Sequence, residues 1–238
     1  MENQFIRSEA LIGKAAVEKL KNSAVIVFGI GGVGSFTAEM LARGGVGKIT
    51  LVDCDCVSVS NLNRQLVALH STLGKDKAEI MKQRIEDINP ECSVNVINCF
   101  YLPENADCID LSCYDYIADA VDTVSAKLEL IKRADSLGIP VISCMGTGNK
   151  FDPLRLRVSA VEKTQGCPLC KVMRRELRLL GIKGVKAVWS DEEPKKPRLQ
   201  LDSPESSRHA PASLPFVPSS AGILMAKEII FDLIGDLI

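Results

Sequence analysis

The residues of this chain with the clearest chemical meaning are four closely spaced glycines and an aspartate that follows them. Gly29, Gly31, Gly32 and Gly34 come directly after a short apolar segment. A turn without side chains lets backbone N–H groups approach a phosphate, and the start of the following helix favours an anion. Asp53 ends a second apolar segment nineteen residues after Gly34, where a ribose-binding carboxylate is expected. The pattern predicts a nucleotide site, but it does not separate ATP from NAD or FAD.

The polar residues that follow the second apolar segment favour a triphosphate. Its cleavage requires cations on the phosphate oxygens, where charge develops, and a carboxylate to hold Mg²⁺. Arg64 and Lys77 can supply the cations, and Asp122 can supply the carboxylate. Asp55 and Asn61 lie in the same part of the sequence and can face the same crevice. A dehydrogenase has little use for this set, so we expect ATP with Mg²⁺.

The elements that must position these residues alternate between strand and helix. The patterns predict strands at 24–29, 48–53, 93–98, 114–119 and 139–144, and helices at 33–43, 75–88 and 123–137. Such alternation is typical of an α/β fold with a Rossmann-like, doubly wound and mostly parallel sheet. Ligands bind beyond the carboxyl ends of the strands in such sheets. Before the first strand, Ser8 is predicted to cap a helix that runs to Leu20.

The regular alternation of strand and helix patterns ends at about residue 145. We therefore expect residues 1–145 to form the nucleotide-binding unit and residues 146–238 to form a C-terminal part. This part is predicted to hold an edge strand at 154–161, a basic helix at 168–180, a strand at 185–190, a mobile loop at about 191–218 and a helix at 219–234. The loop is polar and rich in proline. The last helix is apolar enough to dock on the sheet or on a partner subunit.

Composition excludes several classes of protein. The chain has 238 residues with 46% hydrophobic content, enough for one large domain with a core. We see no transmembrane segment and no signal peptide in the sequence. The nine cysteines are an odd number, scattered through a chain that needs no disulfides, which favours a reducing cytoplasm. A net charge of −1 gives no global signal for nucleic acid.

Five segments resemble motifs of the ubiquitin-activating superfamily, whose members adenylate carboxylates. They are residues 29–34, 51–55, 60–65, 74–79 and 119–122. The resemblance implies a C-terminal extension of the ubiquitin-activating-enzyme type and the following contacts: Asp53 with the ribose hydroxyls, Asn61 and Arg64 with the triphosphate, Lys77 with the phosphates and ribose, and Asp122 with magnesium. Segment 7–13 resembles the one whose arginine, here Arg7, reaches the γ-phosphate, sometimes from a partner subunit. A homodimer is therefore expected.

The cysteines help to distinguish branches of this superfamily. Sulfur-carrier activators of the molybdopterin and thiamine pathways resemble the chain through residue 145, but they usually carry two Cys-x-x-Cys pairs that bind a structural zinc. This chain has one pair, Cys167 and Cys170, and no cysteine follows it. We therefore do not expect a structural zinc. A covalent thioester with a carrier protein is not expected either.

Segments 7–13, 146–153, 168–177 and 215–222 resemble the tRNA threonylcarbamoyladenosine dehydratases. The resemblance covers nearly the whole chain. It implies that the protein uses ATP to activate the threonine carboxylate of N6-threonylcarbamoyladenosine in tRNA, and that the acyl adenylate then cyclises, with release of AMP and pyrophosphate. Ring closure needs only a positioned nucleophile within the substrate, so no protein nucleophile is required.

A tRNA substrate requires a basic surface, and residues 150–198 offer one. They contain thirteen Lys or Arg against six Asp or Glu. The candidates for contacts with tRNA phosphates are Lys171, Arg174, Arg175, Arg178, Lys183 and Lys186. Aromatic residues make up only 5% of the chain, so backbone and shape contacts are expected more than base stacking.

Three other functions remain open. The protein could adenylate the Gly-Gly end of a sulfur-carrier protein, which would make a carrier or sulfur-relay protein its partner. It could be an oxidoreductase that uses only the Gly29–Asp53 pattern. It could also be a scaffold that has kept the fold without catalysis.

Overall fold

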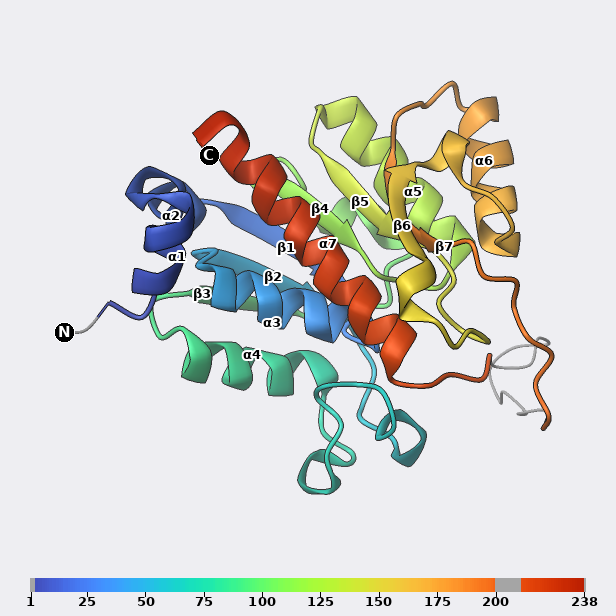
Figure 1. The fold of residues 1–238 in the computed structure, drawn as a ribbon, viewed down its shortest axis with the longest axis horizontal. Helices are drawn as coiled ribbons and strands as arrows, with labels where there is room; N and C mark the ends of the chain where they lie inside the picture. Colours follow the sequence, from blue (N-terminus) through green and yellow to red (C-terminus); the bar gives the residue numbers. More distant parts are fainter. Residues whose placement is uncertain (1–2, 200–210, 238) are drawn as a thin grey trace.

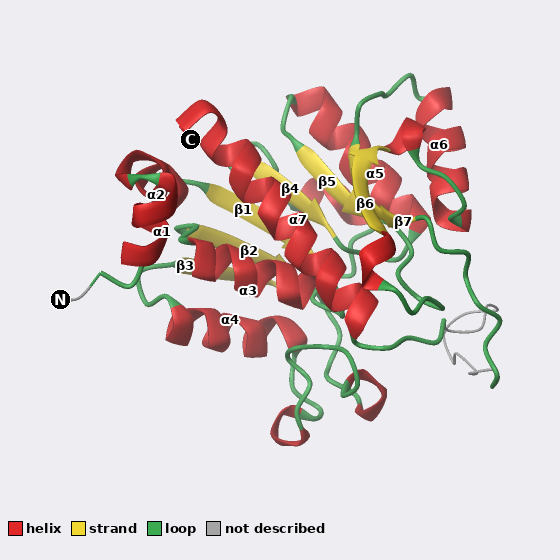
Figure 2. Cartoon of the chain, in the orientation of Figure 1, coloured by secondary structure: helices red, strands yellow, loops and turns green. Residues whose placement is uncertain are grey.

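The computed structural model describes residues 3–199 and 211–237, and in these residues seven strands form one sheet (Figures 1 and 2). Their order across the sheet is β3-β2-β1-β4-β5-β7-β6. All neighbours are parallel except β6, which runs antiparallel to β7. The bounds are β1 Ala24–Phe28, β2 Lys48–Val52, β3 Ser93–Ile97, β4 Tyr116–Asp119, β5 Val141–Cys144, β6 Leu156–Ala160 and β7 Lys186–Ser190. The expected mostly parallel α/β sheet is confirmed.

Helices cover both faces of this sheet (Figure 1). One face carries α3 (Gly34–Gly44), α4 (Lys77–Ile88) and α7 (Phe216–Ile234), and the other carries α5 (Val124–Leu137) and α6 (Pro168–Leu179). The predicted strands and these helices are present, with ends that differ by at most three residues. Among the described residues, no helix is both long enough and apolar enough to span a membrane.

The sequence of strand β1 is apolar throughout because both faces of the strand are buried. Val25 and Val27 point into the core shared with α3 and α7, whereas Ile26 and Phe28 point into the core shared with α5. All of its side chains are buried. A central parallel strand has helices on both faces, so it reads as a continuous apolar run with no polar alternation. This burial places the end of β1, and the glycines after it, firmly in space.

The closing helix α7 docks on its own sheet and on α3. A Cβ on Gly222 would lie 2.3 Å from the carbonyl oxygen of Val33, so the two helices approach each other closely at this glycine. The Tyr116 hydroxyl donates to Asp232 Oδ2 at 2.6 Å, and Lys186 Nζ lies 2.7 Å from the same oxygen. The C-terminal helix is therefore tied to β4 and β7. The sequence left open whether this helix docks on the sheet or on a partner subunit. In the structure it docks on the sheet of its own chain.

The predicted N-terminal helix from Ser8 to Leu20 is wrong in its extent. The segment forms two helices, α1 (Ile6–Ile12) and α2 (Lys14–Lys21). Gly13 separates them with φ of +83° and ψ of +158°, a conformation that breaks the helical hydrogen bonding. Ser8 lies inside α1 and does not cap it, because the helix begins earlier.

The predicted loop at 191–218 ends too late, whereas residues 191–199 contain no helix or strand, as expected, and the mobility of the loop stays a prediction. Helix α7 already begins at Phe216. At the other end, the Glu192 side chain is buried and its Oε2 accepts hydrogen bonds from the N–H groups of Phe151 and Asp152, each at 3.0 Å. Burial with these backbone partners explains why a charged residue is held here. Residues 200–210, the centre of the predicted loop, lie outside the described residues.

The predicted division of the chain at residue 145 stays a prediction. Strands β6 and β7 come from the second part, yet they extend the sheet beyond β5. The two parts therefore share hydrogen-bonded backbone, and β7 pairs with β5 in parallel.

Candidate active site

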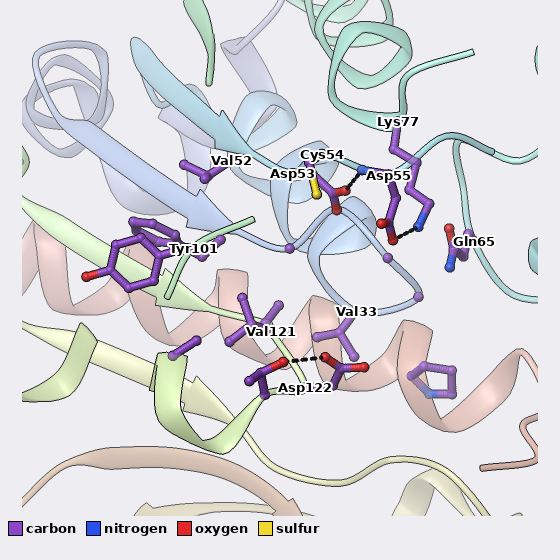
Figure 3. A pocket seen from close by; sticks show the side chains of 18 of the residues that line it. Val33, Val52, Asp53, Cys54, Asp55, Gln65, Lys77, Tyr101, Val121 and Asp122 are labelled. Atoms are coloured by element: carbon purple, nitrogen blue, oxygen red, sulfur yellow. Dashed lines mark hydrogen bonds and ion pairs between the residues drawn. The ribbon is translucent and has the colours of Figure 1, made fainter. Parts of the chain in front are cut away.

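A cavity of about 350 Å³ opens at the carboxyl ends of the central strands (Figure 3). Gly29 follows β1, Asp53 follows β2, and Asp122 lies three residues after the end of β4, and all three line it. Parallel strands bring their carboxyl ends to one edge, which is why residues far apart in sequence meet there. The structure thus places the cavity where the sheet pattern predicted a ligand.

The glycine turn forms one wall of the cavity. Gly29 has φ of +83°, and a Cβ on it would lie 2.8 Å from the carbonyl oxygen of Ala120. A Cβ on Gly34 would lie 1.7 Å from the carbonyl oxygen of Gly29, so Gly34 permits close packing at the start of α3 and does not line the cavity. Gly31 and Gly32 do line it. The turn therefore offers bare backbone to a ligand, as a phosphate site requires.

Asp53 connects the glycine turn to the end of β2. Its Oδ2 accepts from the N–H of Ile30 at 2.6 Å, and its Oδ1 accepts from the N–H of Asp55 at 2.8 Å. Burial raises the pKa of Asp53, although these backbone hydrogen bonds act in the opposite direction. Each carboxylate oxygen has a further lone pair. The side chain is therefore held rigidly and can still accept hydrogen bonds from ribose hydroxyls.

Lys77 and Asp55 form an ion pair at the rim of the cavity (Figure 3). Lys77 Nζ lies 2.7 Å from Asp55 Oδ2, and both residues line the cavity. The Lys77 side chain is only 6% exposed, because it starts α4 and packs inward, whereas that of Asp55 is 62% exposed. The buried stem fixes where the ammonium lies, and the exposed carboxylate is free to move when a phosphate arrives.

Arg64 lies beside the glycine turn. It occupies a turn after the short 3-10 helix Val59–Asn61. A Cβ on Gly32 would lie 3.5 Å from Arg64 Cγ. One terminal nitrogen, Nη1, donates to the carbonyl oxygen of Ser60 at 2.8 Å. Burial lowers the pKa of Arg64, so the guanidinium stands in a partly desolvated position where it acts strongly on an anion.

Asp122 lies across the cavity from Lys77 (Figure 3). It is exposed, and its Oδ1 accepts from the Thr123 hydroxyl at a long 3.4 Å. Among the described residues, no group of three or more His, Cys, Asp or Glu is arranged to hold a metal ion. Asp122 could thus contribute one oxygen to a magnesium ion, with phosphate and water supplying the others, as is usual for this ion.

A buried ion pair beneath Asp122 was missed by sequence reasoning. Lys127 Nζ lies 3.1 Å from both carboxylate oxygens of Asp119, and neither side chain is exposed. Asp119 Oδ1 also accepts from the N–H of Val121 at 3.2 Å. The pair therefore holds the segment that carries Asp122. Its signal in the sequence was a charged residue inside an otherwise apolar helix face.

Gln65 was also missed as a lining residue. It lies in segment 60–65, where the family resemblance implied roles for Asn61 and Arg64 only. Its side chain is buried, lines the cavity, and its Oε1 has no hydrogen-bond partner within residues 3–199 and 211–237. A buried acceptor without a partner is costly, so a ligand that donates to it would be favoured.

Two predicted site residues do not reach the cavity. Asn61 Oδ1 accepts from the N–H of Ser58 at 3.0 Å and caps the short 3-10 helix, and the residue does not line the cavity. Arg7 is exposed on α1. This helix lies beside the amino ends of β1 and β2 (Figure 1). The cavity lies at the opposite ends of these strands. The ligand roles of both residues stay predictions, and that of Arg7 requires a second subunit.

The predicted tRNA-binding residues separate into two groups. Five of them, Lys171, Arg174, Arg175, Arg178 and Lys183, line a second cavity of about 460 Å³ along α6. Lys186 does not, because its ammonium is paired with Glu228 at 3.0 Å and Asp232 at 2.7 Å on α7. Its charge is therefore compensated within the fold, and its contact with tRNA phosphates stays a prediction.

Comparison with known proteins identifies the family. Residues 5–236, nearly the whole chain, match the ThiF family. The chain belongs to the ThiF family. The tRNA threonylcarbamoyladenosine dehydratase of Bacillus subtilis is 46% identical over 246 residues, with 100% of this chain and 97% of that protein covered.

Solved structures agree with this ThiF-family assignment. The tRNA N6-threonylcarbamoyladenosine dehydratase of Escherichia coli in complex with AMP superposes with a TM-score of 0.86 at 35% identity, covering 97% of this chain and 93% of that one. Its complex with ATP gives a TM-score of 0.84 at 34% identity and the same coverage. A molybdopterin-synthase adenylyltransferase of Haemophilus influenzae is 36% identical over 53% of this chain and 51% of that protein.

Proposed function

We propose that the protein uses ATP to cyclise N6-threonylcarbamoyladenosine in tRNA, through an acyl adenylate and with release of AMP and pyrophosphate. One observation carries the proposal. The glycine turn, Arg64, Lys77 and Asp122 meet at one cavity, in a chain that is similar from end to end to tRNA threonylcarbamoyladenosine dehydratases. A nucleotide-binding fold alone would not need this set of charges.

The chemistry follows from the positions of these groups. A carboxylate oxygen of the substrate attacks the α-phosphorus of ATP, and the bond to pyrophosphate breaks. Negative charge develops on the phosphate oxygens, and Arg64 and Lys77 would stabilise it. Asp53 would accept from the ribose hydroxyls. Asp122 would hold a magnesium ion, which would neutralise phosphate charge when bound. Lys77 would then exchange Asp55 for a phosphate oxygen.

The second step needs no group of the protein as nucleophile. A heteroatom of the same threonylcarbamoyl side chain attacks the activated acyl carbon, and AMP leaves. The water lost in ring closure is accounted for by cleavage of ATP to AMP and pyrophosphate. The contribution of the protein is to hold the two ends of the side chain together and to keep bulk water away. Thr147, Gly148 and Pro211 from the second half of the chain help to enclose the cavity.

The cavity along α6 supports contact with the tRNA backbone. Lys171, Arg178 and Lys183 line it, whereas Arg174 is tied to the carbonyl oxygen of Thr164 at 2.7 Å and Arg175 is paired with Glu176. Cations that are free of partners can displace the counterions of a nucleic acid, which is the main source of sequence-independent affinity. A protein that acts on tRNA in this way would work in the cytoplasm.

We include a homodimer in the proposal because of Arg7. Arg7 is exposed on α1, and this helix lies at the amino ends of the strands, opposite the cavity, so Arg7 would serve the cavity of a second copy. A mixture of Arg7→Ala and Asp122→Ala chains tests this. If the site is shared, mixed dimers contain one intact site and recover about a quarter to a half of the activity, whereas each variant alone is inactive. Activity no greater than the sum of the two variants would contradict a shared site.

The decisive experiment is an analysis of nucleosides by mass spectrometry. tRNA that contains threonylcarbamoyladenosine is incubated with the protein, ATP and magnesium and then digested to nucleosides. Unmodified tRNA treated in the same way is the control. We expect the modified nucleoside to lose one water and AMP to appear in equal amount. An unchanged nucleoside in the presence of ATP turnover would overturn the proposal.

A second candidate is adenylation of a sulfur-carrier protein. The similarity to a molybdopterin-synthase adenylyltransferase over about half of the chain favours it. It predicts exchange between pyrophosphate and ATP that depends on a protein ending in Gly-Gly and not on tRNA. The same preparation can be tested with both substrates, so the two functions are separated directly.

A further inference from the structure

The guanidinium of Arg64 is held in the fold through one of its nitrogens. Nη1 donates to the carbonyl oxygen of Ser60 at 2.8 Å and to Asn63 Oδ1 at 3.1 Å. Within residues 3–199 and 211–237, no carboxylate pairs with Arg64, and no protein group accepts from its Nε or Nη2. Both accepting groups are neutral. They therefore set the direction of the guanidinium while its positive charge and its other N–H groups stay available to a phosphate.

Asn63 connects this arginine to a distant part of the chain. Its Nδ2 donates to the carbonyl oxygen of Ser213 at 2.9 Å, and the two residues are 150 positions apart in the sequence. Arg64 and Ser213 line the nucleotide cavity, whereas Asn63 does not. Asn63 thus lies behind two residues of the cavity wall and joins them.

The two hydrogen bonds also fix which way the Asn63 amide faces. If the amide were flipped, its NH₂ group would face the guanidinium, which has only donors, and its oxygen would face the carbonyl oxygen of Ser213. Neither contact would be a hydrogen bond. The amide therefore has one favourable orientation, and the bond to Ser213 helps to keep the acceptor oxygen turned toward Arg64.

The segment that contains Ser213 is held on its other side by Asn149. Asn149 Oδ1 accepts from the N–H of Ala212 at 2.9 Å, and its own N–H donates to the carbonyl oxygen of Ala212 at 2.7 Å. Asn149 has φ of +61°, and among the described residues it is the one non-glycine residue with a positive φ. Asparagine adopts this conformation more readily than most residues, and the hydrogen bonds offset its cost.

Residues 211–213 also pack against the opposite part of the cavity wall. A Cβ on Gly148 would lie 2.7 Å from Pro211 Cβ, so the two chain segments are in close contact there. Gly148, Pro211 and Ser213 all line the nucleotide cavity. A continuous series of contacts therefore runs from this wall through Asn63 to the guanidinium of Arg64.

We propose that Asn63 is a positioning residue, which directs Arg64 toward the phosphates of the nucleotide and is itself held in place by Ser213. The inference rests on the proposed function for the reaction in which Arg64 takes part. Asn63 does not reach the cavity, so it acts through Arg64. A neutral acceptor suits this role, because a carboxylate at the same position would pair with the guanidinium and offset the charge that acts on the phosphates.

A double-mutant cycle tests whether Asn63 acts through Arg64. AMP formation with modified tRNA is measured for Asn63→Ala, for Arg64→Ala and for the double variant. Asn63→Ala should lower kcat about tenfold and change the Kd for ATP by less than about twofold, because a misdirected guanidinium stabilises the transition state less. In the double variant, Asn63→Ala should add no loss to that of Arg64→Ala. Losses that multiply in the double variant would overturn the proposal.

Two further variants complete the kinetic test. Asn63→Asp keeps an acceptor for Arg64, but it adds a charge and loses the donor to Ser213, so it should be slower than Asn63→Ala. Asn22→Ala removes an exposed amide at the end of α2, where Nδ2 donates to the carbonyl oxygen of Glu18 at 2.8 Å, and should leave kcat unchanged. Wild-type activity of Asn63→Asp would reject the proposal.

The mobility of the Arg64 side chain gives a readout that requires no reaction. In NMR relaxation measurements on the full chain, the order parameter of the Arg64 Nε–H bond should fall in Asn63→Ala and stay unchanged in Asn22→Ala. It should also fall in Asn149→Gly, which permits the left-handed backbone but removes the oxygen that holds Ala212. An unchanged order parameter in Asn63→Ala would overturn the proposal.

The two readouts separate this inference from the proposed function. If wild-type protein forms no AMP with modified tRNA while the order parameter falls as expected, the proposed function is rejected and the positioning of Arg64 by Asn63 is supported. If wild-type protein forms AMP and Asn63→Ala keeps its full kcat, the positioning role is rejected and the proposed function stands.

Discussion

At the scale of single residues, the cavity contains groups that hold its shape and groups that are free to contact a ligand. Both oxygens of Asp53 accept backbone hydrogen bonds, so this side chain also fixes the turn. Asp122 is exposed and has only a long contact with Thr123. Arg64 is held through the carbonyl oxygen of Ser60 and lies near the glycine turn. We therefore expect Asp122 and Arg64 to affect the reaction more than the fold.

This difference leads to a kinetic prediction. Arg64→Ala and Asp122→Ala should each lower kcat for AMP formation by about 10²–10³, because they act on charge that develops in the transition state. The Kd for ATP should change by less than about fivefold. Stopped assays of AMP and calorimetric titration measure the two quantities. Lys75→Ala, which removes an exposed charge outside the cavity, is the control. Equal losses of binding and rate would show that the two residues act on the ground state.

The buried ion pair leads to a stability prediction. Lys127→Met leaves Asp119 as an uncompensated buried charge and should lower the free energy of unfolding by about 3–5 kcal/mol. Adding Asp119→Asn should recover part of the loss. Lys132→Met on the same helix, where the side chain is 61% exposed, should change stability by less than about 0.5 kcal/mol. Urea unfolding measures all three, and equal effects of Lys127→Met and Lys132→Met would refute a structural role for the pair.

At the scale of elements, the unit β1–turn–α3 is organised by how closely its backbone packs. Gly34 begins α3 against the carbonyl oxygen of Gly29, and Gly29 lies against Ala120 at the end of β4. The turn is therefore held from two sides without side chains. Gly31, by contrast, has open space toward the cavity, since a Cβ on it would lie 3.7 Å from its nearest neighbour, Gln65 Nε2.

Two alanine substitutions test this arrangement. Gly34→Ala places a methyl group where a backbone oxygen stands, so we expect a loss of about 1–3 kcal/mol in the free energy of unfolding and weaker ATP binding. Gly31→Ala should change stability by less than about 0.5 kcal/mol. Thermal unfolding of both variants without nucleotide provides the comparison. A larger loss for Gly31→Ala would mean that the turn is held by contacts other than these.

At the scale of the whole molecule, the second half of the chain completes a site begun by the first. Strands β6 and β7 extend the sheet, and α7 returns across it to pack on α3. Pro218 on α7 lines the nucleotide cavity with Thr147 and Pro211. The basic residues of α6 lie on the same half. One continuous body thus carries both the nucleotide cavity and the cationic surface.

The cationic surface gives a prediction about tRNA. Arg178→Ala and Lys183→Ala should each reduce the slope of log K against log salt concentration by about 1, because each removes one free phosphate contact. Lys186→Ala should leave this slope unchanged and should lower thermal stability, because it breaks ion pairs with Glu228 and Asp232. Filter binding at several salt concentrations measures the slopes. A lower slope for Lys186→Ala would show that its ammonium is available to RNA after all.

Much of this molecule follows from sequence because its signals are local. The buried apolar runs predict β1 and β2, since a central strand needs no polar face, and the glycine spacing predicts the turn and the start of α3. Asp53, Lys77 and Asp122 were placed at one cavity correctly, because parallel strands bring their carboxyl ends to a common edge.

Other features were decided only by the tertiary structure. Lys186 was expected to contact tRNA phosphates, yet α7 brings Glu228 and Asp232 to it from more than forty residues away. Glu192 lies in a loop, as expected, but the N–H groups of Phe151 and Asp152 hold its side chain in the interior. Local sequence sets the conformation and apolar pattern of each element, whereas the partner of a charged side chain depends on which elements pack together. The packing of elements is a property of the whole fold, so the partner of a charged side chain cannot be inferred from a single segment.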